Sequence, residues 1–435
     1  MSTIAEVKIW GSTIGAVSLG DDQQIASFQY DPEFARSGIE VAPLMMPLSD
    51  RVYSFPALAI ESFHGLPGLL SDSLPDRFGN ALIDAWLGSQ GRDSNSFNAV
   101  ERLCYTGSRG MGGLEFVPAK GPKPTSHHLL EVDRLVQLAS DILTHRDSLE
   151  TNFTNQTDAD TMTDILRVGT SAGGARAKAV IAWNPDTNEV RSGQSKADEG
   201  FEHWLLKFDG VGNNRDKELA DPEGYGAIEY AYSKMAVDCG ITISQCRLFE
   251  EGDRRHFMTR RFDRLAGGGK LHMQSLAAMA HLDFNQAGGH SYEQAFDVMR
   301  RLGLPASATA QMYRRMVFNV IARNQDDHVK NIAFLMDRSG NWSLAPAFDV
   351  TYSYQPSGKW TSNHQMTING KRDNFTLDDF HECGKSALLK QGQAKKIITE
   401  VQQVVSQWLD YAEHVNVNTD QRDKIQKTLR IKRFE

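Results

Sequence analysis

Asp326 and Asn331, two side chains suited to phosphoryl transfer, are five residues apart in a polar segment of the chain. Protein kinases use an Asp and an Asn at this separation in one irregular loop, where the Asp orients the substrate hydroxyl and the Asn oxygen binds a metal ion. A bare pair of this kind is more often part of a solvated turn. His328 and Lys330 lie between the two, and this tighter pattern favours a catalytic loop with Asp326 as the catalytic residue.

A second carboxylate, Asp349, follows eighteen residues after Asn331, behind a strand-like stretch. Mg²⁺ prefers oxygen ligands and often bridges protein carboxylates to phosphates. Asn331 and Asp349 are therefore the candidate metal ligands. The order differs from the Asp-Phe-Gly segment of kinases, because Phe348 precedes the aspartate and no glycine follows it.

A glycine-rich stretch, expected as a loop at Gly169–Gly174, precedes an apolar run and contains Ser171. Glycine lets a backbone approach phosphate groups closely, so the stretch is a candidate phosphate loop. It is not a Walker A motif, because Ala175 stands where that motif requires Lys. An ordinary flexible hairpin is the alternative, and Lys178 just beyond the loop favours the phosphate-binding interpretation.

Lys207 ends another apolar, strand-like run. A lysine at such a position can grip the α- and β-phosphates of a nucleotide, and Glu229 on the following predicted helix is a candidate partner. An ordinary lysine at the edge of a strand is the alternative.

The elements around these residues fall into a strand-rich half and a helical half. We predict three units: 1–120, 125–265 with the glycine loop, and 266–435 with the catalytic loop, the first boundary lying in the proline-rich segment Pro118–Pro124. The predicted class is α+β, as a two-lobed, protein-kinase-like fold with an added N-terminal subdomain. The expected helices are Phe78–Leu87, Leu129–Leu143, Ala227–Asp238, Ser291–Leu302, Ala308–Arg323, Ala387–Trp408 and Thr419–Arg430. The expected strands are Ala179–Trp183, Trp204–Phe208, His256–Phe262 and a hairpin over Ile332–Leu344.

Composition excludes several classes. The net charge of −8 over 435 residues argues against a protein that coats DNA by itself, and four cysteines without a Cys-x-x-Cys pair argue against a zinc site or a disulfide framework. The chain has neither a leader-like start nor an apolar run long enough to span a membrane, so we expect a cytoplasmic protein without membrane contact. The basic C-terminal residues are interpreted as a solvated helix face: Lys424, Lys427, Arg430, Lys432 and Arg433.

Taken together, the motifs resemble the HipA family, the serine/threonine kinase toxins of bacterial type II toxin–antitoxin pairs. The similarity runs along the whole chain, and no single motif would carry it. The motifs are GLPGLLSDSLPDRFG, GSRGMGGLEFVP, SAGGARAK, HWLLKFDG, TRRFDR, NQDDHVKN and LAPAFDVTYSY.

This resemblance implies roles for individual residues. It implies ATP and Mg²⁺ as cofactors, Asp326 as the catalytic Asp, and Asn331 and Asp349 as metal ligands. Arg260 and Phe262 fall where the family's hinge meets adenine, although the family often has an acidic residue in place of Arg260. The nucleotide-binding residues implied are Gly173, Gly174, Ala175, Arg176, Lys178, Lys207, Arg260, Phe262, His328, Lys330, Asn331, Phe348, Asp349 and Thr351.

The resemblance also implies partners and regulation. Family members phosphorylate a protein substrate, typically an aminoacyl-tRNA synthetase, and bind a small helix-turn-helix antitoxin (HipB-like) that makes most of the contact with operator DNA. Ser171 falls where family members phosphorylate themselves, and a phosphate in that loop is expected to inactivate the kinase. Two alternatives remain open: a small-molecule phosphotransferase on the same scaffold, and a catalytically idle transcriptional co-repressor.

Overall fold

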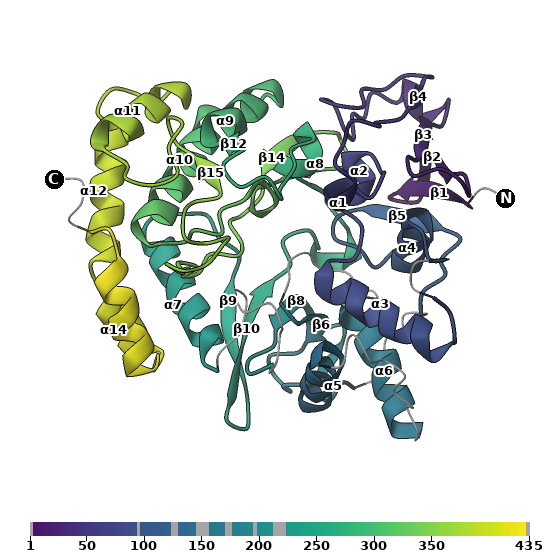
Figure 1. The fold of residues 1–435 in the computed structure, drawn as a ribbon, viewed down its shortest axis with the longest axis horizontal. Helices are drawn as coiled ribbons and strands as arrows, with labels where there is room; N and C mark the ends of the chain where they lie inside the picture. Colours follow the sequence, from purple (N-terminus) through teal and green to yellow (C-terminus); the bar gives the residue numbers. More distant parts are fainter. Residues whose placement is uncertain are drawn as a thin grey trace.

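The computed structural model describes residues 3–93, 96–122, 129–144, 156–169, 176–194, 198–211 and 223–431. Helices and sheets both contribute throughout this part of the chain, so the α+β class is confirmed. Figure 1 shows the N-terminal sheet (purple) and the C-terminal helices (yellow) at opposite sides of the molecule, with the second sheet (teal) between and below them.

The N-terminal sheet has the strand order β4-β3-β2-β1-β5, and all its pairings are antiparallel. Along β1, the residues Ala5, Val7 and Ile9 point to one face and are buried, as expected for alternation in a half-buried strand. Helix α4 covers this face through Val100 and Leu103. The elements are β1 (Thr3–Ile9), β2 (Ser12–Leu19), β3 (Ser27–Tyr30), β4 (Val52–Tyr53), β5 (Leu114–Val117), the 3-10 turn η1 (Phe34–Arg36), and helices α1 (Ile60–Phe63), α2 (Gly68–Ser71), α3 (Arg77–Ser89) and α4 (Ala99–Thr106).

The second sheet has the order β7-β6-β8-β10-β9. Its strand β6 is buried along its whole length, because α6 lies against it and α3 and α5 complete the same core. Helix α3 thus packs in the core of the second sheet although it belongs to the N-terminal third of the chain. The elements are α5 (Val132–Thr144), α6 (Gln156–Gly169), β6 (Lys178–Trp183), β7 (Val190–Ser192), β8 (Glu202–Lys207), α7 (Tyr225–Asp238), β9 (Cys246–Glu251) and β10 (Arg254–Arg260).

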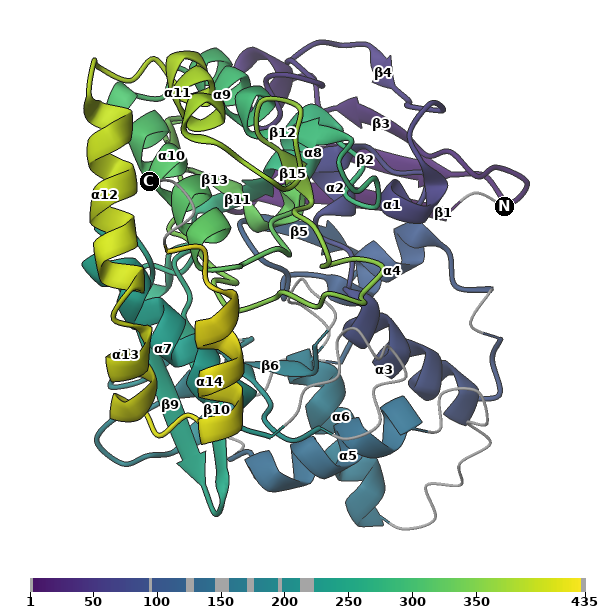
Figure 2. The same ribbon diagram turned by 60° about the vertical axis from the view of Figure 1, so that its left-hand side comes forward.

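The C-terminal half is mostly helical and forms the largest core cluster around α7, α9, α10 and α12. In Figure 2, α13 lies beside α7 and α14 lies in front of the second sheet. Two small sheets, β11-β13-β14 and β12-β15, complete this half. The elements are β11 (His272–Ser275), α8 (Leu276–Ala280), β12 (His290–Ser291), α9 (Tyr292–Arg301), α10 (Ala306–Ile321), β13 (Ala333–Met336), β14 (Trp342–Leu344), β15 (Met366–Thr367), α11 (Leu377–Ser386), α12 (Gln393–Val405), α13 (Trp408–His414), α14 (Thr419–Thr428), and the 3-10 turns η3 (Ala266–Gly268) and η4 (Val329–Asn331).

Most of the predicted elements are present with ends shifted by a few residues, but two interpretations are wrong and one strand was missed. The single helix predicted over Ala387–Trp408 is broken: Leu388 has a left-handed backbone (φ 55°), α12 begins only at Gln393, and α13 begins at Trp408. Gly169 ends α6 and does not begin a loop. Strand β11, which pairs with β13, was not predicted.

No helix within the described ranges combines the length and the low polarity that crossing a bilayer requires.

Candidate active site

The polar loop after α10 brings Asp326 and Asn331 together. The helix ends at Ile321, and Arg323 adopts a left-handed backbone (φ 59°) that turns the chain out of the helical path. The side-chain nitrogen Nδ2 of Asn331 donates to the backbone carbonyl oxygen of Asp326 at 2.8 Å and closes the loop. The amide oxygen of Asn331 can therefore serve as a ligand, because the nitrogen of the same group is already used.

The carboxylate of Asp326 is half-buried and has two neighbours on one oxygen. Its Oδ1 accepts a hydrogen bond from the indole nitrogen of Trp360 at 2.8 Å. His328 Nε2 lies 3.8 Å from the same oxygen. Trp360 was not singled out by sequence reasoning, because it lies far along the chain in a loop without a recognisable pattern.

Asp349 follows the extended stretch after β14 and adopts a left-handed backbone (φ 52°). This conformation is uncommon for a residue other than glycine, and such strain concentrates at functional sites. The preceding residues are held on both sides: Ala347 donates its N–H to Thr242 O at 2.8 Å, and the ring of Phe348 lies 5.8 Å from that of Phe262. The carboxylate of Asp349 is thereby fixed at the end of a packed segment.

Lys207, at the end of β8, joins Asp349 to helix α7. Its Nζ lies 2.6 Å from Glu229 Oε1 and also donates to Asp349 Oδ1. The predicted contact between Lys207 and Glu229 is confirmed. Arg176 adds a second cation, 3.8 Å from Glu229 Oε2. Four charged groups from four segments of the chain thus form one ion cluster.

The charges of Lys207 and Asp349 are stabilised against burial by their neighbours. Burial by itself would lower the pKa of Lys207, but the carboxylates of Asp349 and Glu229 raise it above its ordinary value. Burial would also raise the pKa of Asp349, but Lys207 and, more weakly, Lys178 lower it to about 2. Asp349 is therefore a carboxylate at neutral pH, which is the form that binds a metal ion.

One cavity is lined by residues of the catalytic loop and by the segment of Asp349, including His328, Asn331, Phe348 and Asp349. The metal ligands predicted from the sequence, Asn331 and Asp349, thus face the same space. Oxygen donors of this kind fit Mg²⁺, which commonly takes one or two protein ligands together with phosphate oxygens. The types of donor therefore suit Mg²⁺, while the cavity itself, at about 30 Å³, is too small to hold a nucleotide.

The predicted glycine loop is only partly within the described residues. Ser171, Gly173, Gly174 and Ala175 lie outside them. Of the two remaining loop positions, Arg176 stacks its guanidinium 3.9 Å from the ring centroid of Tyr225 and faces the ion cluster. Because the glycines lie outside the described residues, their phosphate-binding role stays a prediction.

Lys178 is not an exposed loop residue. Its side chain is 2% exposed and its Nζ lies 3.0 Å from Asp76 Oδ2. Asp76 also caps α3 by accepting from Gly79 N at 2.6 Å. A few residues earlier, Asp72 accepts from the backbone and hydroxyl of Ser275, at 2.6 and 2.8 Å. Sequence reasoning assigned no role to these two aspartates of the GLPGLLSDSLPDRFG motif. In the structure Asp76 contacts the first residue of β6, and Asp72 contacts the last residue of β11.

The predicted hinge is tied to the N-terminal region. Arg260 at the end of β10 is exposed and pairs with Glu202 at 3.2 Å, so its side chain is engaged on the surface. Just beyond it, Asp263 accepts from Gly112 N at 2.7 Å, and Arg264 donates to Gly110 O at 2.9 Å. A Cβ atom on Gly112 (φ +75°) would lie 2.7 Å from Met273 N, so only glycine fits this contact. The GSRGMGG motif is therefore a docking segment for the hinge.

Two other predicted nucleotide-binding residues lie at the margin of the site. Lys330 places its Nζ 4.4 Å from the ring centroid of Phe284. Thr351 is buried, and its hydroxyl makes no hydrogen bond to the described residues. Neither the position of Lys330 nor that of Thr351 by itself indicates nucleotide binding.

Comparison with known families places the chain. The family model for the HipA-like C-terminal domain matches residues 170–408, and the model for the HipA N-terminal domain matches residues 5–117. The first match alone covers more than half of the 435 residues. The chain belongs to the HipA family.

A solved structure agrees with this assignment at the level of the fold. The HipA protein in the Shewanella oneidensis complex of HipA, HipB and operator DNA is 15% identical, covers 99% of this chain and 97% of its own length, and superposes with a TM-score of 0.68. The two-lobed, kinase-like α+β fold predicted from the sequence is thus confirmed. The Helicobacter pylori proinflammatory kinase CtkA covers 52% of this chain and 88% of its own length at 12% identity, with a TM-score of 0.34.

A curated relative from Sinorhizobium fredii, named "Putative kinase Y4mE", is 24% identical over 126 residues. The match spans 27% of this HipA-family chain and 30% of that protein's length.

Proposed function

We propose that this HipA-family chain is the kinase toxin of a toxin–antitoxin pair and transfers the γ-phosphoryl group of ATP to a serine or threonine hydroxyl. One observation carries the proposal: Lys207 contacts both Glu229 and Asp349, and Asp349 shares a cavity with Asn331 of the catalytic loop. Phosphoryl transfer needs a lysine on the phosphates, oxygen ligands for Mg²⁺ and a carboxylate beside the acceptor hydroxyl, and these residues are of those kinds.

Each residue would then have a distinct task. Asn331 and Asp349 would hold Mg²⁺, which neutralises charge on the phosphates when bound. Lys207 would exchange its contact with Asp349 for phosphate oxygens and keep its contact with Glu229. Asp326 would accept the hydrogen bond of the acceptor hydroxyl and orient it toward the phosphorus. Phe262 and Phe348 would offer an apolar surface to the adenine.

The first experiment is phosphate transfer from γ-labelled ATP with Mg²⁺, using the wild type and Asp326→Ala. Label incorporated by the wild type is expected to fall by about 10²–10⁴-fold in the variant, the usual contribution of a general base. Asp410→Ala, at an exposed position of helix α13, is the matched control and should retain full activity. Absence of label with unphosphorylated wild type, together with tight antitoxin binding, would favour the idle co-repressor instead.

Autophosphorylation at Ser171 is the regulatory part of the proposal. A phosphate adds about −1.5 to −2 charge at pH 7, which would repel ATP phosphates from the glycine loop. The measurement compares Ser171→Ala with protein phosphorylated at Ser171. The phosphorylated form should lose nucleotide binding, and equal turnover by both forms would contradict this regulation.

The partners follow from the relative in the Shewanella complex, which is described with HipB and operator DNA. We propose a small helix-turn-helix antitoxin that makes most of the DNA contact for this chain, whose own net charge is −8. The protein substrate is proposed to be an aminoacyl-tRNA synthetase. Phosphoproteomics of cells expressing the wild type beside Asp326→Ala should show a synthetase phosphosite only in the former.

A further inference from the structure

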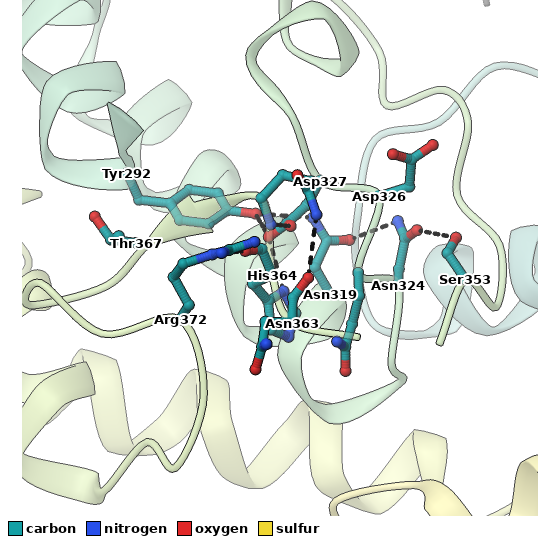
Figure 3. Close-up of polar contacts among 12 residues, drawn as sticks. Tyr292, Asn319, Asn324, Asp326, Asp327, Ser353, Asn363, His364, Thr367 and Arg372 are labelled. Carbon is teal, nitrogen blue, oxygen red and sulfur yellow. Dashed lines mark hydrogen bonds and ion pairs between the residues drawn. The ribbon is translucent and has the colours of Figure 1, made fainter. Parts of the chain in front are cut away.

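Asp327, the neighbour of the candidate catalytic residue, is buried in a polar cluster that the phosphoryl-transfer chemistry does not use. Its Oδ2 accepts from the hydroxyl of Tyr292 at 2.8 Å and lies 2.9 Å from His364 Nδ1. Its Oδ1 accepts from the backbone N–H of Gln365 at 2.8 Å. Figure 3 shows Asp327 turned into this cluster, whereas Asp326 extends away from it.

One chain of donors reaches Asp327 from the C-terminal end. The guanidinium of Arg430 lies 3.0 Å from His364 Nε2, and Arg430 is itself 3% exposed. Arginine can only donate, so Nε2 must be the acceptor. The proton of a neutral His364 therefore sits on Nδ1 and is donated to Asp327. Because Arg430 donates to His364, His364 in turn donates to Asp327.

A second chain of donors reaches Asp327 from the segment of Asp349. Ser353 donates to Asn324 Oδ1 at 3.1 Å, Asn324 donates to Asn319 Oδ1 at 3.0 Å, and Asn319 donates to the oxygen of Tyr292 at 3.0 Å. The tyrosine hydroxyl then donates to Asp327. Every link of this chain also points toward the same carboxylate, as the dashed lines in Figure 3 trace.

We propose that Asp327 is the positioning residue of the catalytic loop. Two chains of donors converge on its carboxylate from different sides, and they fix the direction in which the side chain of Asp326 leaves the backbone. The inference rests on the proposed kinase function for its catalytic consequence. Its structural content is independent of that function, because it concerns the order of the loop itself.

The arrangement makes the loop sensitive to groups far from the reacting atoms. Among the described residues, Asp327 is the charged acceptor on which both chains end. Removing a donor from such a buried carboxylate lowers the stability of the folded state. Arg430 also donates its backbone N–H to Ile321 O at 3.0 Å, at the end of α10. The C-terminal segment thus holds both the start of the loop and the acceptor within it.

Two substitutions of His364 form a matched pair that separates the two ring nitrogens. An asparagine can place its amide nitrogen where Nδ1 lies and keep the donor to Asp327, while losing the acceptor for Arg430. A glutamine can place its amide oxygen where Nε2 lies and keep that acceptor, while losing the donor to Asp327. If the donor to Asp327 positions the loop, His364→Asn should resemble the wild type more closely than His364→Gln.

The readout that does not depend on activity is hydrogen–deuterium exchange of the backbone amides of residues 324–331. His364→Gln and Asp327→Asn should speed exchange in this loop by about tenfold or more relative to His364→Asn, while exchange in sheet β7-β6-β8-β10-β9 stays unchanged. Tyr292→Phe is a milder variant, should the others fold poorly. Equal loop protection in all four proteins would overturn the inference.

Kinetics then test the catalytic consequence. Asp327→Asn and His364→Gln should lower kcat by about 10²-fold, as expected for a catalytic group misplaced by about 1 Å, with the KM for ATP nearly unchanged. If the wild type were inactive but the substitutions still changed loop exchange as described, the proposed kinase function would be refuted and the positioning role would stand. An active wild type with unaltered kcat and loop exchange in Asp327→Asn would refute the positioning role alone.

Discussion

The two halves of the candidate site are held by different forces. Around Lys207, the contacts are ion pairs in which Glu229 is buried and 29% of the Asp349 side chain is exposed. Around Asp327, the contacts are directional hydrogen bonds between buried groups, and only the one carboxylate is charged among the acceptors. Ion pairs can exchange one partner for another of the same charge, whereas a network of directed donors cannot. The Lys207 cluster therefore suits a site that receives phosphates, and the Asp327 network suits a loop that must not move.

The largest effect is expected from removing the cation of the first half. Lys207→Met should lower kcat/KM for ATP by about 10²–10³-fold, because a donor to the transferring group is lost. It should also lower the free energy of unfolding by about 3 kcal/mol, because the buried carboxylate of Glu229 loses its nearest cation. Steady-state kinetics, with a separate measurement of ATP affinity, gives the first effect, and chemical denaturation gives the second.

The double variant Lys207→Met with Glu229→Leu is the control for that experiment. It should regain stability and remain inactive, since the unpaired carboxylate is gone but no cation is restored. If both properties recovered together, Lys207 would serve the fold alone.

A smaller effect is expected from the second half, and of a different kind. Tyr292→Phe removes one donor from Asp327 and leaves Asn319 Nδ2 without its acceptor, which should cost about 1–3 kcal/mol of stability. The dissociation constant for ATP should stay the same. A loss of nucleotide affinity comparable to that of Lys207→Met would erase the distinction between the two halves.

The pH dependence of stability gives a third way to sharpen the comparison. Asp349 has a folded pKa of about 2 and an ordinary value of 3.8, so the unfolded chain binds its proton more readily. Its stabilisation is complete above about pH 4 and is lost as the pH falls from about 4 toward 2. Melting temperatures of Asp349→Asn should fall less steeply over this range than those of the wild type, and parallel curves would contradict the ion-pair assignment.

The smallest effect is expected at Trp360, whose indole contacts the candidate catalytic carboxylate directly. Trp360→Phe keeps the ring and removes the donor, so Asp326 should rotate more freely and kcat should fall about 3- to 10-fold, equivalent to roughly 1 kcal/mol. Steady-state phosphate transfer measures it. A faster variant would instead mean that the indole occupies the position of the acceptor hydroxyl.

Local patterns predicted the residues that lie close together in sequence or end regular elements. Asp326 and Asn331 could be paired from spacing, and Lys207 with Glu229 from a strand followed by a helix. Tertiary contacts between distant segments could not: Lys178 was expected in a phosphate loop, yet it is buried against Asp76. No local pattern distinguishes these two situations, because both place a lysine at the start of an apolar strand.

The C-terminal residues teach the same lesson. Arg430 was interpreted as part of a solvated basic helix face, but α14 ends at Thr428 and the arginine turns inward to His364. The interpretation failed because helical periodicity was extended beyond the last helical turn. The start of α12 was placed at Ala387 instead of Gln393 for a similar reason, since Leu388 is an ordinary helix former that here adopts a left-handed conformation.

The contacts of the GSRGMGG motif with the predicted hinge determine whether this protein can be truncated between its predicted units. A truncated protein beginning near residue 125 would retain Asp263 and Arg264 but lose Gly110 and Gly112, the backbone groups that satisfy them. Such a fragment should precipitate on expression, even though it would contain every residue of the proposed phosphoryl-transfer chemistry. For engineering purposes, the amino-terminal third is a required part of the folded protein and not a detachable appendage.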